Sequence, residues 1–321
     1  MGSTDSHAGG PRALVVSNML PDGRYPERGS FVRDQVDALR GLGEWEVELF
    51  EFAPGAKALP RAARDLRRRY ARERFDVVHA HFGLTAWPAL AVKAHGRALT
   101  LHGTDVRHPR TRLATRAVLP QMRLVAAVSE ALLAEIPGRR ARARALVLPC
   151  GVDMERFQAI PRARAWGELL DADHPYLLFP ADPDRPEKRY DRAISLANAI
   201  GVRLLTLGGI EPERVPLYVN GAQAVIVPSE REGFGLAVLE ALACDVPVLA
   251  TPVGIHAQAL EGVSGTLCAP FELERWRDVL APHLAANDPR VRGRAHAEPF
   301  SAKHMAERVA AAWRSLVAEA G

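Results

Sequence analysis

Short apolar runs rich in β-branched residues alternate with stretches of helical periodicity from residue 12 almost to the end of this 321-residue chain. This alternation is typical of βαβ units, which build parallel sheets covered by helices. In the first half it predicts six strands, enough for one doubly wound sheet. These strands are expected at Ala13–Leu20, Glu46–Phe52, Asp76–His81, Ala98–Gly103, Leu124–Ser129 and Ala145–Pro149.

The alternation restarts after a turn at Gly151–Asp153 and an arginine-dotted connector. The second set of strands is expected at Tyr176–Pro180, Arg203–Gly208, Ala224–Pro228, Pro247–Ala250 and Gly265–Cys268. We therefore predict an α/β chain of two Rossmann-like domains, an N-terminal one over residues 12–155 and a C-terminal one over 156–300, after a disordered leader at 1–11. Because open α/β sheets bind ligands at the carboxyl ends of their strands, we expect the active site in a cleft between the two sheets.

The last segment of the chain, residues 301–321, has the pattern of an amphipathic helix. Met305, Val309, Trp313 and Leu316 recur at helical spacing and form one apolar stripe. A stripe of this size must be covered. We expect it to cross back and pack on the N-terminal domain.

Composition excludes several classes of protein. Hydrophobic residues make up 48% of the chain and charged residues 25%, and no apolar run reaches the roughly 18 residues of a membrane span. The net charge of +4 is too small to favour a nucleic-acid partner. The three cysteines form no CxxC pair, so we expect neither a metal site nor disulfides, and a cytoplasmic location.

The most informative stretch is a strand end, a glycine-rich turn and an apolar helix over residues 228–243. Two carboxylates, Glu232 and Glu240, lie eight positions apart, which places the first just before the helix and the second about two turns into it. The free amides of Gly233, Phe234 and Gly235 would suit an anionic ligand, and a carboxylate would accept hydrogen bonds from hydroxyls. This combination predicts a site for a polyhydroxylated, phosphorylated molecule.

A simpler interpretation treats Glu232 as a first-turn partner of the helix dipole and Glu240 as a solvated helix residue. The neighbours of Glu240 oppose that interpretation, because a helix that is apolar on most sides is buried, and an unpaired glutamate in it would be costly. Those neighbours are Leu236, Val238, Leu239, Ala241 and Leu242.

With this block in place, the sequence resembles the retaining family 4 glycosyltransferases of the GT-B fold, in the branch that handles bacterial surface polysaccharides and natural-product sugars. Further motifs agree with the family in order and spacing. They are Gly29-Ser-Phe-Val-Arg, Val78-His-Ala-His, His102-Gly-Thr-Asp, Ala127-Val-Ser, Pro149-Cys-Gly-Val-Asp, Pro186-Glu-Lys-Arg and Asp245-Val-Pro-Val-Leu-Ala-Thr-Pro-Val-Gly254.

The resemblance assigns roles to individual residues. It implies that Glu240 holds the ribose of a nucleotide sugar, that Glu232 holds the hexose, and that His102 lies near the donor sugar. It places Lys188 on the diphosphate; the family's usual Gly-Arg before this lysine is replaced here by Ala181–Arg185, so Arg185 is a stand-in for that arginine. The remaining donor-binding residues that it implies are Gly29, Ser30, Gly233, Phe234, Gly235 and Leu236.

The histidines of the Val78-His-Ala-His motif are a separate case. We expect His79 and His81 to point to opposite faces of their strand, so that at most one of them faces the site. An arginine-rich segment at residues 60–75 is expected to be one helix with a solvated charged face. Nucleic acid and anionic lipid are the alternative partners for it, and the family resemblance favours lipid.

The predicted function is a retaining hexosyltransferase that moves a hexose from a nucleoside-diphosphate sugar to an acceptor hydroxyl, with no cofactor and no metal. The acceptor could be a sugar, a lipid-linked molecule or a small molecule, the lipid-linked case adding peripheral contact with the inner face of the membrane. Two alternatives stay open. One is a nucleotide-sugar epimerase or phosphorylase of the same fold, and the other is a non-catalytic protein that binds nucleotide sugars or polyanions.

Overall fold

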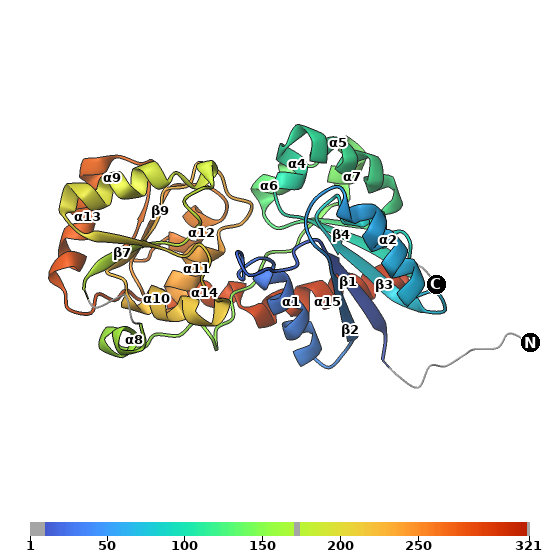
Figure 1. The fold of residues 1–321 in the computed structure, drawn as a ribbon, viewed down its shortest axis with the longest axis horizontal. Helices are drawn as coiled ribbons and strands as arrows, with labels where there is room; N and C mark the ends of the chain where they lie inside the picture. The colour runs from blue at the N-terminus through green and yellow to red at the C-terminus, as the bar shows by residue number, and fades with distance from the viewer. Residues whose placement is uncertain (1–9, 170–173, 320–321) are drawn as a thin grey trace, which may run out of the picture. The chain divides into compact units, whose positions relative to one another are not determined.

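The computed structural model describes residues 10–169 and 174–319, and in this part of the chain it forms two compact units (Figure 1). The first unit takes the chain up to Leu20, Phe31–Pro149 and the chain from Lys303 onward; the second takes Pro21–Ser30 and Cys150–Ala302. The leader expected at residues 1–11 lies almost wholly outside the described residues. The domain bounds expected from the sequence stay a prediction.

The first unit contains a six-stranded parallel sheet in the order β2-β1-β3-β4-β5-β6. All six predicted strands are present. Their bounds are β1 Arg12–Ser17, β2 Glu46–Glu51, β3 Arg74–His81, β4 Lys93–Leu101, β5 Leu124–Ala127 and β6 Leu146–Val147. The helices that connect them are α1 Ser30–Gly41, α2 Ala58–Arg69, α3 Ala86–Ala89, α4 Thr104–Arg107, α5 Pro109–Val118, α6 Glu130–Ala134 and α7 Arg139–Ala143.

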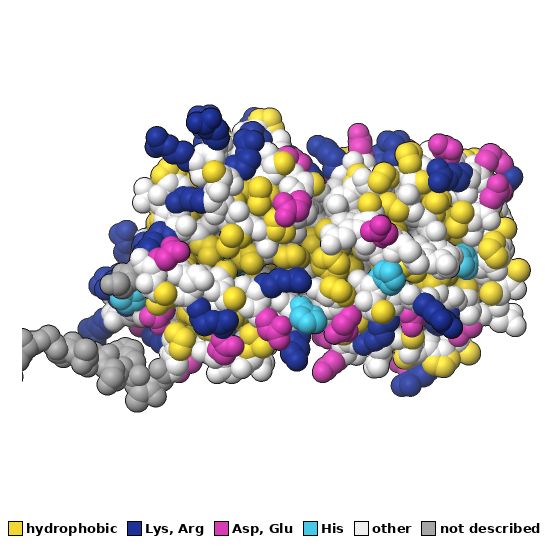
Figure 2. All heavy atoms as spheres, turned by 180° about the vertical axis from the view of Figure 1, so that it is seen from behind, with side chains coloured by type: hydrophobic (Ala, Val, Ile, Leu, Met, Phe, Trp, Pro, Cys, Tyr) yellow, Lys and Arg dark blue, Asp and Glu magenta, His cyan; other side chains and the backbone are white. Residues whose placement is uncertain are grey.

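The arginine-rich segment is a helix only in part. Helix α2 ends at Arg69, and the residues from Arg74 on belong to β3, so the prediction of one helix over 60–75 is wrong at its C-terminal end. The helix packs on Ala62 and Leu66, whereas its arginines lie on the opposite, exposed side. Figure 2 shows further Lys and Arg side chains on the upper edge of the first unit, the left half of that view, where Figure 1 places α4, α5 and α7 rather than α2.

The last helix, α15 (Ala302–Ala318), lies in the first unit from Lys303 onward and runs beside α1 and the central strands in Figure 1. Its buried stripe includes the four residues expected from the periodicity. The Trp313 indole is fully buried and its Nε1 donates a hydrogen bond to Nδ1 of His79 on β3, at 3.1 Å. Leu316 packs against the backbone of Gly96 on β4, where no side chain would fit.

The second unit contains a five-stranded parallel sheet in the order β11-β10-β9-β7-β8. The strands are β7 Tyr176–Phe179, β8 Arg203–Thr206, β9 Ala224–Val227, β10 Val248–Ala250 and β11 Leu267–Cys268. The helices are α8 Arg162–Glu168, α9 Tyr190–Ile200, α10 Val215–Gly221, α11 Leu236–Ala243, α12 His256–Leu260, α13 Leu273–Ala285 and α14 Arg294–Ala297. The predicted α/β fold with two parallel sheets is confirmed.

The core of this unit forms where α9 and α13 cover the sheet. Apolar residues of β7, β9 and β10 pack there on the fully buried Trp276 of α13. Strands buried on both faces read as continuous apolar runs, which explains why they were predictable. Among the described residues, no helix is long and apolar enough to cross a membrane.

Candidate functional site

The turn between β9 and α11 carries the two glutamates of the sequence motif. The helix begins at Leu236, because Gly235 precedes it with φ of +123°, a conformation that few residues other than glycine adopt. Glu232 therefore lies in the turn, outside the helix. Glu240 is only the fifth helical residue, so the expectation of two helical turns before it is wrong.

Glu232 forms an ion pair with Lys188, 44 residues earlier in the chain. The lysine Nζ donates to both carboxylate oxygens, at 2.7 and 2.8 Å, and the Ser229 hydroxyl donates to one of them at 2.8 Å. The side chains of Lys188 and Glu232 are only 16% and 9% exposed. Burial alone would raise the pKa of Glu232, but the Lys188 charge and these hydrogen bonds lower it overall, so the carboxylate is charged at neutral pH.

Lys188 lies in the loop that follows β7, in a single turn of 3₁₀-helix at Pro186–Lys188. The Glu230 amide donates to the Glu187 carbonyl at 2.9 Å, which ties this loop to the turn after β9. The other cation expected here, Arg185, has its guanidinium on the Glu187 carboxylate instead, at 2.7 Å, and is 54% exposed. The structure thus brings Lys188 to Glu232 and holds Arg185 on a different carboxylate.

The segment after β10 holds the glycine-rich turn of Gly233–Leu236 in place. The Ile255 amide donates to the Phe234 carbonyl at 2.9 Å, and a side chain at Gly254 would collide with that carbonyl. Phe234 is buried, whereas Gly233 and Leu236 are half-buried. Glu240 is half-buried too, among buried neighbours on α11, so its carboxylate lies at the border of the core rather than inside it.

A residue that the sequence analysis missed, His256, lies against this turn. It is 0% exposed, and its Nδ1 lies 2.8 Å from the Thr251 carbonyl oxygen. Its Nε2 is buried with no hydrogen-bond partner. The available signal was its place in the segment after β10, since parallel sheets present ligand-facing groups after their strands. A single histidine there carried no spacing pattern to single it out.

The first unit holds a row of three histidines at the ends of β3 and β4. The rings of His79 and His81 stack at 4.9 Å between centroids, and those of His81 and His102 at 5.1 Å. The prediction that His79 and His81 point to opposite faces is wrong, because residues two apart on a strand share a face. Nδ1 of His81 and Nε2 of His102 share a hydrogen bond at 2.9 Å.

Burial keeps this row uncharged at neutral pH. Desolvation lowers the pKa of His79 and of His102 to about 3. Beside them, burial raises the pKa of Asp105 to about 6, although its carboxylate accepts backbone N–H bonds from His102 and Gly103. Asp105 thus orders the loop after β4, and His102 offers a neutral imidazole at the strand end.

The remaining predicted residues, Gly29 and Ser30, lie at the N-terminus of α1. Gly29 has φ of +73°, and Ser30 is the first residue of the helix. Both belong to the second unit, whereas α1 from Phe31 on belongs to the first. Their role in donor binding stays a prediction.

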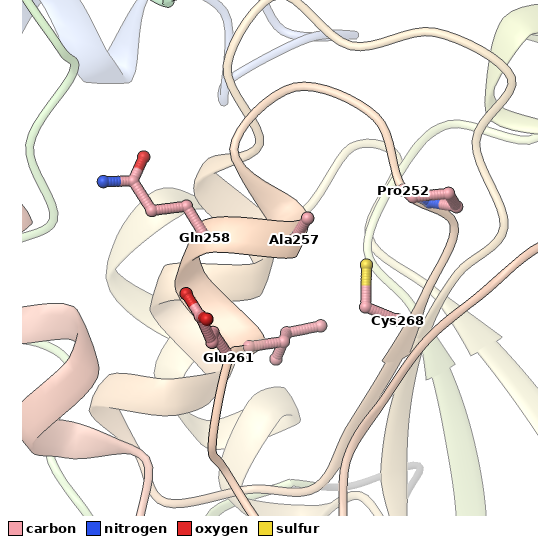
Figure 3. Close-up of a pocket in the computed structure, with 6 residues that line it drawn as sticks. Pro252, Ala257, Gln258, Glu261 and Cys268 are labelled. Atoms are coloured by element: carbon pink, nitrogen blue, oxygen red, sulfur yellow. The ribbon is translucent and has the colours of Figure 1, made fainter.

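A hollow of about 510 Å³ lies elsewhere in the second unit, between α12 and β11 (Figure 3). It is lined by Pro252, Ala257, Gln258, Leu260, Glu261 and Cys268, and Gln258 points away from Cys268 in the close-up. The hollow contains none of the predicted site residues. Ala257, Gln258 and Glu261 are exposed there, whereas the side chain of His256 is buried.

Comparison with known proteins follows the same division of the chain. Residues 23–156 match the model of Glycosyltransferase Family 4, and residues 165–297 match that of Glycosyl transferases group 1. The chain belongs to the family 4 glycosyltransferases. It is 29% identical to a D-inositol 3-phosphate glycosyltransferase of Nocardia farcinica, over 96% of this chain and 81% of that protein.

Solved structures show the GT-B type of fold. Sucrose-phosphate synthase from Thermosynechococcus elongatus superposes with a TM-score of 0.74 at 20% identity, over 96% of this glycosyltransferase and 100% of that chain. Anabaena HepE in complex with UDP-glucose superposes with a TM-score of 0.68 at 17% identity, over 95% and 100%. At these identities the likeness concerns the fold alone.

Proposed function

We propose that this glycosyltransferase is a retaining hexosyltransferase that moves a hexose from a nucleoside-diphosphate sugar to an acceptor hydroxyl. The observation that carries the proposal is the largely buried Lys188–Glu232 pair beside the glycine-rich turn of Gly233–Leu236. The Lys188 ammonium suits a phosphate, and the Glu232 carboxylate beside it suits sugar hydroxyls. These are the two groups joined by the bond that breaks in such a donor.

In the proposed site each residue has a separate task. Lys188 binds the diphosphate, Glu232 and the turn amides hold the hexose hydroxyls, and Glu240 holds the ribose. His102 accepts from or donates to the hexose as a neutral imidazole. Arg185 can join the diphosphate by leaving Glu187, and Gly29 with Ser30 would offer backbone amides to it.

The reaction that we propose needs no nucleophile from the protein. The bond between the anomeric carbon and the diphosphate oxygen breaks, the acceptor oxygen bonds to the same face of that carbon, and the leaving diphosphate takes the acceptor proton. Negative charge grows on the diphosphate as the bond breaks, so Lys188 stabilises the transition state more than the ground state. The remainder of the catalysis is positioning of donor and acceptor.

UDP-glucose and D-inositol 3-phosphate are the first donor and acceptor to test. The first is bound in the HepE structure, and the second is in the name of the Nocardia farcinica relative. An acceptor from bacterial surface polysaccharide or natural-product synthesis is the alternative, which is the branch that the sequence motifs resemble.

A thermal-shift screen against UDP, GDP and TDP sugars, followed by a transfer assay, tests the proposal. A ligand that binds only the folded state raises the melting temperature by mass action. Transfer of hexose with retained anomeric configuration supports the function. Conversion of the donor sugar without an acceptor would favour an epimerase. Release of the sugar that depends on phosphate would favour a phosphorylase. Tight binding without turnover would favour a binding protein.

Replacing Glu240 by glutamine is expected to weaken donor binding by about 1.5–3 kcal/mol, since the amide keeps the volume but loses the charged acceptor. Calorimetric titration with the nucleoside diphosphate measures this loss. The matched control is Glu261→Gln, in the same unit at the hollow beside α12. An unchanged affinity in folded Glu240→Gln would remove the ribose assignment.

We also propose peripheral contact with an anionic membrane through α2. The side chains of Arg61 and Arg68 are 83% and 85% exposed, and both lie more than 3.5 Å from Asp65, their acidic neighbour. In vesicle sedimentation we expect binding to phosphatidylglycerol but not to phosphatidylcholine, lost at high salt. The double variant Arg64→Glu with Arg67→Glu should lower it several-fold, whereas Arg275→Glu in the second unit should not. Equal binding by both variants would contradict this contact.

A further inference from the structure

His256 is the first residue of α12, and its hydrogen bond to Thr251 fixes its tautomer. A backbone carbonyl only accepts, so the imidazole Nδ1, 2.8 Å from that oxygen, must carry the hydrogen. The neutral ring then has its lone pair on Nε2. That atom is buried and has no hydrogen-bond partner, which destabilises a folded protein. An unpaired buried nitrogen of this kind calls for a physical explanation.

The ring edge that carries Nε2 lies against Gly235, the residue before α11. A Cβ atom at Gly235 would lie 2.6 Å from both Nε2 and Cδ2 of His256. The imidazole therefore occupies the space that a side chain at residue 235 would need. It also limits how closely the turn of Gly233–Leu236 can approach α12. Gly235 cannot be replaced without displacing the ring, quite apart from its positive φ.

Burial keeps the His256 ring neutral against the charge of Glu232. Burial lowers its pKa most, the Glu232 carboxylate raises it, and the Lys188 ammonium lowers it again, with a net lowering. At neutral pH the Nε2 atom is accordingly a hydrogen-bond acceptor. The turn of Gly233–Leu236, which meets this edge of the ring at Gly235, offers backbone amides as donors.

We propose that His256 is a positioning residue for the sugar-binding turn, Gly233–Leu236: its ring fixes Gly235, and its Nε2 takes a hydrogen bond from the turn backbone when a nucleotide sugar is bound. This inference rests on the proposed function, because it presumes that the turn holds the hexose. It gives a task to a buried polar atom that has no hydrogen-bond partner within the described protein.

The test compares binding of UDP-glucose with binding of UDP in four full-length variants. His256→Leu removes the hydrogen bond to Thr251 and the proposed one at Nε2, and should lower the affinity for UDP-glucose about tenfold, while the affinity for UDP stays within twofold. His256→Asn keeps a donor for Thr251 but is too short to reach Gly235, so it should behave like the leucine variant. His256→Gln places its terminal amide near the position of Nε2 and should recover part of the affinity.

His283→Leu is the matched control in the same unit. Its Nε2 also contacts a backbone carbonyl, that of Gly265 at 2.7 Å, and its ring also lies beside a glycine of positive φ. His283 lies on α13, which is not part of the sugar-binding turn. We therefore expect the affinities for UDP and UDP-glucose to stay unchanged in this variant.

Three results would overturn the inference: no change in His256→Leu, a parallel loss of UDP and UDP-glucose affinity that follows the melting temperature, or no recovery in His256→Gln. A wild-type protein that binds neither ligand would instead overturn the proposed function, and the inference with it.

Discussion

Replacing Trp313 by alanine is expected to lower the free energy of unfolding of the first unit by about 3–5 kcal/mol, the usual cost of deleting a fully buried large aromatic side chain. The Trp313 ring packs edge-to-face on Trp45 at 5.2 Å between centroids. Its indole N–H also donates to His79, which would lose that partner in the core. Chemical denaturation followed by circular dichroism measures the loss.

Trp87→Ala is the matched control in the same unit. The Trp87 indole also donates a hydrogen bond, to the Ala114 carbonyl at 3.2 Å, but the residue is 42% exposed. We expect a cost of about 1 kcal/mol for it. If both variants lose the same stability, α15 is not the structural element of the first unit that its contacts indicate.

Regular elements were predictable because each leaves a local pattern in the sequence. Buried parallel strands such as Ala224–Val227 read as continuous apolar runs, and α15 reads as a stripe at helical spacing. Bounds were less secure. Helix α2 ends at Arg69 although arginines continue to Arg74, because the residues from Arg74 on pair in the sheet as β3.

The site was predictable as residue types but not as contacts. Lys188 and Glu232 were singled out separately. Their pairing depends on the loops after β7 and β9, which meet because these two strands are neighbours in the sheet. Nothing local predicts this contact, since each residue also had a solvated alternative. His256 was missed for the same reason, because its neighbour Gly235 is brought to it by tertiary packing.

Lys188→Ala is expected to lower kcat about 10²–10³-fold, the usual effect of removing one preorganised group that stabilises developing charge. The KM for the acceptor should change little, because the lysine contacts only the donor in the proposed mechanism. Binding of UDP should weaken, whereas binding of uridine, which has no phosphate, should not. Steady-state kinetics and competition by these two ligands measure both effects.

The same substitution leaves Glu232 as a buried charge without its lysine, and breaking such a pair can cost about 3–5 kcal/mol. The double variant Lys188→Ala with Glu232→Gln separates folding from catalysis, since the neutral amide needs no cation. We expect it to regain most of the melting temperature but none of the turnover. If turnover returned with stability, or if uridine and UDP weakened equally, Lys188 would hold the turn in place rather than stabilise charge on the diphosphate.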